Sequence, residues 1–250
     1  RRRLHDAWPI SLLIASIAVF YLLTIRHGHD WSSDFALFVA HAKNLVTGVP
    51  YGLTGYVYNP NYSSHSPLSY PPVFSLLLAP VYAIFGLNLD AFKVTVIASF
   101  LIFLIAYYRY ALYRLDQPVS RYGVIAVIAS NLWFWENKDL ILSYYPFQMF
   151  TFISLVLMER LYRENPDPHR RFGLAVAVGL SIYLAYGTRS VGIVLAATLV
   201  LTDLVHRRFR KMSLAAVVAV GVFLVCYAAQ NALLDTDKSY LDILERLMSS

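Results

Sequence analysis

The chain reads DFALFVAHAKNLVTGVPYGLTGYVYNPNYSSHSPLSYPP from Asp34 to Pro72. This stretch is the one long segment too polar for a bilayer, in a chain otherwise made largely of apolar runs. It begins with a single carboxylate at the start of an amphipathic pattern, and it ends at a Tyr-Pro-Pro before a short hydrophobic run. The side of the membrane on which this segment lies therefore decides the fold.

Composition places the protein in a lipid bilayer. The 250 residues are 58% hydrophobic and 14% charged, with a mean hydropathy of +0.53, whereas soluble domains are about 25% charged. Several apolar runs approach or exceed the roughly 17–20 residues that span hydrocarbon, and they are continuous rather than alternating, unlike barrel strands. The single cysteine, Cys226, permits no internal disulfide. We expect an all-α polytopic membrane protein.

About seven spanning helices are expected. The candidates are Trp8–Ile25, Ala91–Ala111, Tyr122–Trp135, Tyr145–Met158, Phe172–Tyr186, Val191–Val205 and Leu214–Ala229. The first is interpreted as a retained helix rather than a signal peptide, because no small-residue cleavage pattern follows it. Val73–Phe85 is apolar but short, follows Pro71-Pro72 and contains Pro80. We expect it to be a re-entrant or interfacial helix.

The distribution of Lys and Arg supports this topology. If Val73–Phe85 does not cross the membrane, fourteen of the 21 basic residues lie on the cytoplasmic side, as the positive-inside rule requires. They are Arg1–Arg3, Arg109, Arg114, Arg121, Arg160, Arg163, Arg170, Arg171, Arg207, Arg208, Arg210 and Lys211. The N-terminus is then cytoplasmic, and the first outer loop (26–89) and the tail (231–250) lie outside. This pattern explains the net charge of +6 without a nucleic-acid partner. No linker divides the chain, so we expect a single domain, 1–250.

Asp34 is the first candidate for chemistry. A helix over Asp34–Val46 would carry one apolar arc, with Asp34 and His41 at its edge and Lys43 nearly opposite. Such a helix lies at the outer interface. Asp34 is then either an ordinary helix-start acid, favoured by the helix dipole, or a site carboxylate. His41 is either an interfacial histidine or a substrate ligand.

Three further sets of residues have a structural and a functional interpretation. Tyr58, His65 and Tyr70 belong to a loop rich in Tyr, Ser and Asn, the residue types that bind sugars but also occur in ordinary loops. Glu136 and Asp139 are either solvated loop acids paired with Lys138 or a second acidic group facing Asp34. With Asp34 they are the only candidates for a divalent metal, which remains an open possibility. Arg189 either lies at the headgroup boundary or binds a phosphate bidentately.

The first outer loop resembles a known family. Its pattern D-x-A-x-x-x-x-A-x-x-L-x-x-G-x-P-Y, followed by Y-P-P-x-x-x-L-L-L-A-P-x-Y-x-x-F-G-L-N, is similar to that of membrane-embedded GT-C glycosyltransferases. The pattern begins at Asp34 and Tyr70 and continues more loosely through Ser143, Pro146-Phe147 and Thr188-Arg189. The similar branch contains bacterial protein-mannosyltransferase-like and aminoarabinose-transferase-like enzymes.

The resemblance implies a GT-C-like helical bundle in a bacterial inner membrane. Such an enzyme transfers a sugar from a polyprenyl-phosphate or polyprenyl-diphosphate donor to an extracytoplasmic lipid, glycan or protein, and membrane lipids surround it. The family's first-loop acid matches Asp34, which is expected to act as a base toward the acceptor. Relatives often carry an acid between Ser143 and Pro146, where this chain has two tyrosines. They are also longer, so the match is to their N-terminal module.

Two other classes of function stay open. One is a non-catalytic membrane protein that binds lipid-linked sugar, and the other is a small-solute transporter. Transporters tend to place ionisable residues within their spans and to contain paired broken helices. Here the expected spans are nearly free of charge, with Lys93 near one end and Asp203 near another, and only one helix looks broken, which favours the enzyme.

Overall fold

The computed structural model describes residues 7–29, 34–55, 70–163, 167–206 and 213–234. Within these ranges the regular secondary structure is entirely helical. Its elements are α2 (Ala7–Leu23), α3 (Phe35–Thr47), α4 (Pro72–Phe85), α5 (Leu89–Ala111), α6 (Pro118–Ser130), α7 (Leu132–Glu136), α8 (Tyr144–Arg163), α9 (Pro168–Thr188), the 3-10 turn η2 (Ser190–Gly192), α10 (Ile193–His206) and α11 (Leu214–Leu234). The expectation of an all-α fold is confirmed for this part of the chain.

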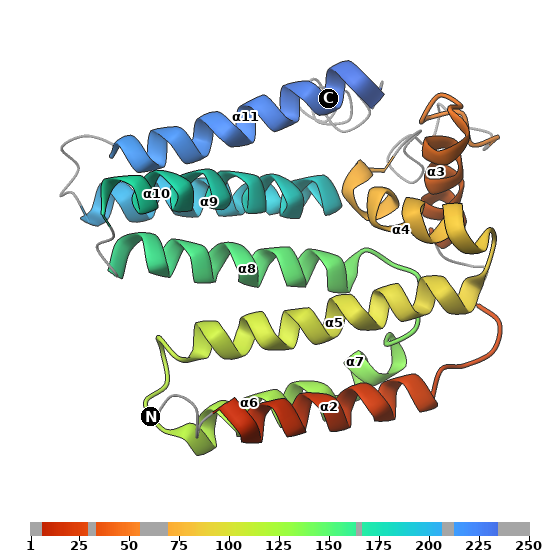
Figure 1. Ribbon diagram of the computed structural model, residues 1–250, viewed down its shortest axis with the longest axis horizontal. Coiled ribbons are helices and arrows are strands. Elements are labelled where there is room, and N and C mark those ends of the chain that lie inside the picture. Colours follow the sequence, from red (N-terminus) through yellow and green to blue (C-terminus); the bar gives the residue numbers. More distant parts are fainter. Residues whose placement is uncertain (1–6, 30–33, 56–69, 164–166, 207–212, 235–250) are drawn as a thin grey trace, which may run out of the picture.

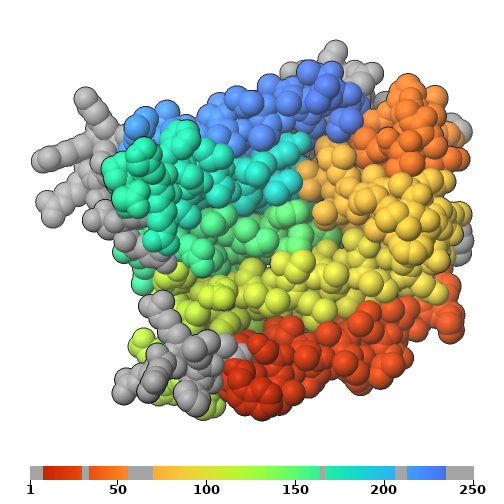
Figure 2. All heavy atoms as spheres, in the orientation of Figure 1, coloured from red at the N-terminus to blue at the C-terminus, as the bar shows by residue number. Residues whose placement is uncertain are grey.

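The long helices form a stack with roughly parallel axes. Figure 1 shows α2, α5, α8, α9 and α11 following one another across the molecule, and each helix in this order contacts the next. α6 packs beside α2 and α5. α10 packs against α9, α11 and α8. α3 and α4 pack on each other at one end of the stack, and α4 also contacts α5 and α9 (Figure 2). The polar first loop thus contributes a helical block at one end of the bundle.

Three helices are long and apolar enough to cross a membrane: Leu89–Ala111, Pro168–Thr188 and Leu214–Leu234. Only 11% of the most apolar part of α11 is buried inside the protein, so most of its apolar surface is available to lipid. α2, α6 and α10 are apolar but shorter. A membrane protein is therefore supported, and seven spans remain a prediction.

Tyr21 joins three helices in the core. Its ring stacks on Phe100 of α5 at 5.1 Å, and its hydroxyl donates to the Ala129 carbonyl of α6 at 2.8 Å. Tyr145 continues the cluster, packing 4.8 Å from Phe100 and donating its hydroxyl to the Phe134 carbonyl. Because buried tyrosine hydroxyls need a partner, these two bonds fix how α2 and α8 meet the α6–α7 region.

One expected helix is interrupted. The sequence predicts a continuous run over Tyr122–Trp135, but α6 ends at Ser130 and α7 begins at Leu132. Asn131 between them is extended, and its side-chain oxygen accepts from the Trp133 amide at 2.9 Å. An Asn that caps a new helix competes with helix continuation, and this local competition produces the break.

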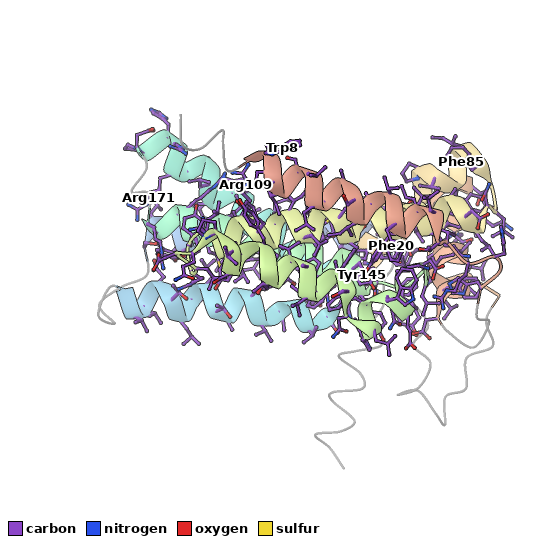
Figure 3. The ribbon with its side chains drawn as sticks, turned by 90° about the horizontal axis from the view of Figure 1, so that it is seen from below. Trp8, Phe20, Phe85, Arg109, Tyr145 and Arg171 are labelled. Atoms are coloured by element: carbon purple, nitrogen blue, oxygen red, sulfur yellow. The ribbon has the colours of Figure 1, made fainter. Side chains whose placement is uncertain are left out.

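Seven of the nine described arginines gather at one end of the bundle. Those at the C-terminal ends of α5 and α8 and the N-terminal ends of α6 and α9 lie together there: Arg109, Arg114, Arg121, Arg160, Arg163, Arg170 and Arg171. Figure 3 shows Arg109 and Arg171 toward this end, with Tyr145 and Phe85 toward the other. Glu159 offsets part of this charge by pairing with Arg114 and Arg163.

Candidate functional site

The end of the bundle opposite this group of arginines contains α3 (Figure 1). Residues 35–47 form a helix as predicted, and Gly48 ends it in the left-handed conformation at φ 71°, which a non-glycine residue adopts only at a cost. Asp34 is the residue immediately before the helix, and its carboxylate makes no capping hydrogen bond. Asp34 is exposed, so the carboxylate remains available to a ligand.

His41 binds residues of the first outer loop and does not line the pocket. It is fully buried, stacks on Tyr51 at 4.1 Å, and its Nδ1 lies 2.8 Å from the Tyr51 carbonyl. Because a carbonyl only accepts, Nδ1 carries the proton, and Nε2 accepts from the Tyr70 amide at 3.4 Å. Burial lowers the pKa of His41, although the bond to Tyr51 opposes that shift.

Two more side chains hold the same turn. Asn44 donates to the carbonyls of Pro50, Tyr51 and Leu53, and the Tyr51 hydroxyl donates to the Tyr70 carbonyl at 2.9 Å. Burial raises the pKa of Tyr51 well above its ordinary value, so the hydroxyl stays protonated as a donor. These bonds fasten both ends of the segment 52–69. Tyr58 and His65, predicted to bind substrate, lie outside the described residues.

A buried charge cluster anchors the second loop. Asp139 accepts from the backbone amide and the guanidinium of Arg26, and from Lys138 at 3.1 Å. Burial favours the neutral acid, but the bonds from Arg26 and Lys138 outweigh it and lower the pKa of Asp139 to about 2. Lys93 donates to the carbonyls of Arg26 and Gly28. The carboxylate predicted for substrate or metal is thus fully engaged by protein groups.

This cluster connects to α3 through His29. The Ile141 amide donates to His29 Nε2 at 2.8 Å, and the His29 ring lies 3.9 Å from the ring of Phe35. Ile141 directly precedes three residues of the pocket wall, Leu142 to Tyr144, and Phe35 directly follows Asp34. The cluster therefore positions both loops that supply the pocket.

The pocket itself has a volume of about 160 Å³. Its walls come from four separate segments: Asp34 and Phe38; Tyr70 and Pro71; Leu142, Ser143 and Tyr144; and Thr188, Arg189, Ser190 and Val191. Three residues predicted from the sequence, Asp34, Tyr70 and Arg189, meet here. Glu136 is exposed and, like Asp139 and His41, is not part of the lining.

Arg189 is held by two neighbours on the second loop. Its guanidinium lies 4.4 Å from the centre of the Tyr144 ring, and Nη1 donates to the Ser143 hydroxyl at 3.5 Å. Arg189 directly follows the last residue of α9, and its backbone is extended. Neither Arg189 nor Asp34 belongs to an ion pair among the described residues, so the pocket holds a cationic and an anionic group that are both free to contact a ligand.

The turn after α9 is sterically constrained. A side chain on Gly192 would lie 2.5 Å from the Tyr186 amide nitrogen, and one on Gly187 would lie 2.5 Å from Val73 Cγ2. These two glycines let α9, α4 and the 188–191 wall approach closely. The sequence indicated Arg189 but not this wall, because its packing depends on contacts between distant segments.

The described residues contain no group of three or more His, Cys, Asp or Glu side chains that could bind a metal. Asp34, Glu136 and Asp139 accordingly do not form one acidic cluster. No protein family model, no curated protein and no solved structure matches this chain. The chemistry of the pocket is then the basis on which functions can be compared.

Proposed function

We propose that the chain is a membrane-embedded glycosyltransferase of the GT-C kind, which moves a sugar from a polyprenyl-phosphate donor to an acceptor hydroxyl. The observation that carries the proposal is that Asp34 and Arg189 line one pocket without being neutralised by each other. The pocket lies at the C-terminal end of α9, a helix able to cross a membrane. A donor with a lipid tail and an anionic phosphate needs its site at such a boundary.

The reaction assigns one role to each charged group. The acceptor oxygen attacks the anomeric carbon of the sugar, and the bond from that carbon to the phosphate oxygen breaks. The acceptor proton passes to the Asp34 carboxylate, a positioned base of the kind that contributes about 10²–10⁴-fold. Polyprenyl phosphate leaves as an anion, which Arg189 stabilises by charge-assisted hydrogen bonds.

The lining of the pocket suits a sugar ring. Phe38, Tyr70 and Tyr144 line it, and aromatic faces of this kind pack against the apolar face of a pyranose.

The proposal includes seven spans, a cytoplasmic N-terminus and a site on the outer side of a bacterial inner membrane. Seven of the nine described arginines lie at the end opposite the pocket, and Arg26 and Arg189 lie at the pocket end, which supports this orientation. The acceptor is left open as a lipid, glycan or protein hydroxyl.

Reconstituted protein can test the proposal directly. Proteoliposomes containing the wild type are supplied with radiolabelled polyprenyl-phosphate sugars, and both donor binding and sugar transfer are measured. Arg189→Gln should weaken donor binding by about 10–100-fold, the value of a hydrogen bond to a charged group of 1.5–3 kcal/mol, whereas Lys43→Gln on the exposed face of α3 should not. Donor binding without transfer by the wild type would favour the non-catalytic binder instead.

A further inference from the structure

A second hollow lies at the other end of α9. It has a volume of about 290 Å³ and is lined by residues from the first turns of α9 and α11: Pro168, Arg171, Phe172, Ala175, Ser213, Leu214, Ala215 and Val218. Since α9 has 21 residues, a rise of 1.5 Å per residue separates this hollow from the Asp34 pocket by about 30 Å. It is an independent feature at the opposite boundary of the bundle.

The lining combines an apolar groove with one cationic side chain. Among the lining residues, Ala175 and Ala215 are buried, while Phe172 and Leu214 remain 59% and 78% exposed. Side chains this exposed on apolar helices are suited to contact with hydrocarbon. Arg171 belongs to no ion pair among the described residues. The groove thus has the amphiphilic character of a lipid rather than that of a soluble anion.

Two acids nearby are already occupied by protein donors. Asp203 accepts from the Ser213 amide and hydroxyl, both at 2.6 Å, and from the Tyr162 hydroxyl at 3.2 Å. Asp167 accepts from the Arg170 amide at the start of α9. Arg171 is the charged residue among those that line the groove, and it is the side chain that an anionic ligand would contact.

Local charge favours an anionic headgroup. In the sequence, the segments 167–171 and 203–213, which contain the lining residues Pro168, Arg171 and Ser213, carry six basic and two acidic residues. Basic pockets between transmembrane helices on the cytoplasmic side are known to accept anionic lipid headgroups. The residues predicted to be cytoplasmic are those at this end of the bundle.

We infer that the groove between the first turns of α9 and α11 is a binding site for an anionic phospholipid of the cytoplasmic leaflet. One acyl chain lies between Phe172, Leu214 and Val218, and the headgroup phosphate contacts Arg171. This inference requires that the helices cross a membrane with this end of the bundle in the cytoplasmic leaflet, and it does not depend on the proposed sugar transfer.

The test compares an anionic and a zwitterionic lipid that share the same acyl chains. The purified full chain is incorporated into nanodiscs containing equal amounts of phosphatidylglycerol and phosphatidylcholine with identical acyl chains, and the retained lipids are identified by native mass spectrometry. The wild type should retain phosphatidylglycerol preferentially. Arg171→Gln should reduce that preference about fivefold, the effect expected for one basic residue at about 1 kcal/mol.

Two further variants separate the groove from general surface charge. Arg170→Gln removes the same charge from the same turn, but Arg170 does not line the groove, so the preference should be kept. Val218→Trp keeps every charge and fills the groove, so the preference should be lost while the helical content measured by circular dichroism is unchanged.

Three results would overturn the inference. They are an equal loss in Arg170→Gln and Arg171→Gln, a retained preference in Val218→Trp, and displacement of phosphatidylglycerol by millimolar glycerol phosphate. The first indicates diffuse attraction, the second shows that no chain occupies the groove, and the third indicates a site for free phosphate.

Discussion

The guanidinium of Arg189 lies over the ring of Tyr144, 4.4 Å from its centre. The glycosyltransferases that the first outer loop resembles are expected to have an acid between the positions of Ser143 and Pro146. In this chain the ring of Tyr144 orients the arginine without neutralising its charge. A cation–π contact attracts the guanidinium while leaving its N–H groups free for an anion. Tyr144 is therefore a positioning residue for Arg189 within the proposed site.

Tyr144→Ala should raise the KM for the lipid-linked donor about fivefold, because a partly exposed cation–π contact contributes about 1 kcal/mol. Tyr144→Phe keeps the aromatic face and should restore the wild-type KM. The measurement is initial transfer rate against donor concentration for the three proteins. Equal losses in Tyr144→Ala and Tyr144→Phe would show that the hydroxyl, not the ring, is what matters.

Asp139→Asn should destabilise the protein by about 3–5 kcal/mol. The substitution leaves Lys138, which is 1% exposed, without its carboxylate partner. Removing one partner of a buried ion pair destabilises a protein by about this amount, because the remaining charge is buried and uncompensated. Denaturant unfolding in detergent measures the change. Glu136→Gln is the matched control, since Glu136 is exposed on the same loop and should change the free energy of unfolding by less than about 0.5 kcal/mol.

The same carboxylate predicts an acid limit of stability. The pKa of Asp139 is about 2 in the folded protein, below the value of about 3.9 for an unfolded aspartate. Its stabilising contribution is therefore complete above about pH 4 and is lost as the pH falls from about 4 to about 2. Unfolding measured across this window should show a steeper loss of stability in the wild type than in Asp139→Asn. Parallel curves would contradict the proposed pairing.

His41 predicts a separate effect at milder pH. Its folded pKa is lowered, so the neutral form is favoured and its contribution to stability declines as the pH falls below about 6.5, the unfolded value. Protonation of Nε2 removes the acceptor of the Tyr70 amide. After correction for the intrinsic pH dependence of exchange, the Tyr70 amide should exchange hydrogen faster at pH 5 than at pH 7. In His41→Gln this extra acceleration should be absent.

Gly187→Ala should destabilise the protein by about 1–3 kcal/mol, the usual cost of overpacking. The added Cβ would lie 2.5 Å from Val73 Cγ2, so α4 must move away from α9. Gly173→Ala on the same helix meets nothing within 4 Å and should be neutral or stabilising by up to about 1 kcal/mol. Thermal unfolding of both variants in one detergent tests the contrast.

The sequence contained enough information to locate α3, its end at Gly48 and the separate short helix α4. These features depend on local chemistry: an apolar arc, a left-handed glycine and a Pro-Pro start. The segregation of arginines was also predictable, because it depends on residue order alone. The number of spans is still a prediction, since α6 and α10 are 13 and 14 residues long.

The site was only partly predictable for a physical reason. The types and positions of Asp34, Tyr70 and Arg189 were enough to indicate them as site residues. Asp139 was different, because it is bound by Lys138 and by Arg26, and Arg26 is distant in the sequence. An acid near a basic neighbour in a short loop does not reveal whether it is buried. The wall formed by Ser143 and Tyr144 likewise depends on how α8 packs against α9.

We propose that the Asp34 carboxylate takes the acceptor proton during sugar transfer. It is tested most directly by single-turnover transfer from a polyprenyl-phosphate sugar in proteoliposomes containing the wild type or Asp34→Asn, with donor binding measured on the same samples. We expect a transfer rate at least about 100-fold lower in Asp34→Asn, with donor affinity changed by less than about threefold. An Asp34→Asn protein that transfers sugar at the wild-type rate would contradict it.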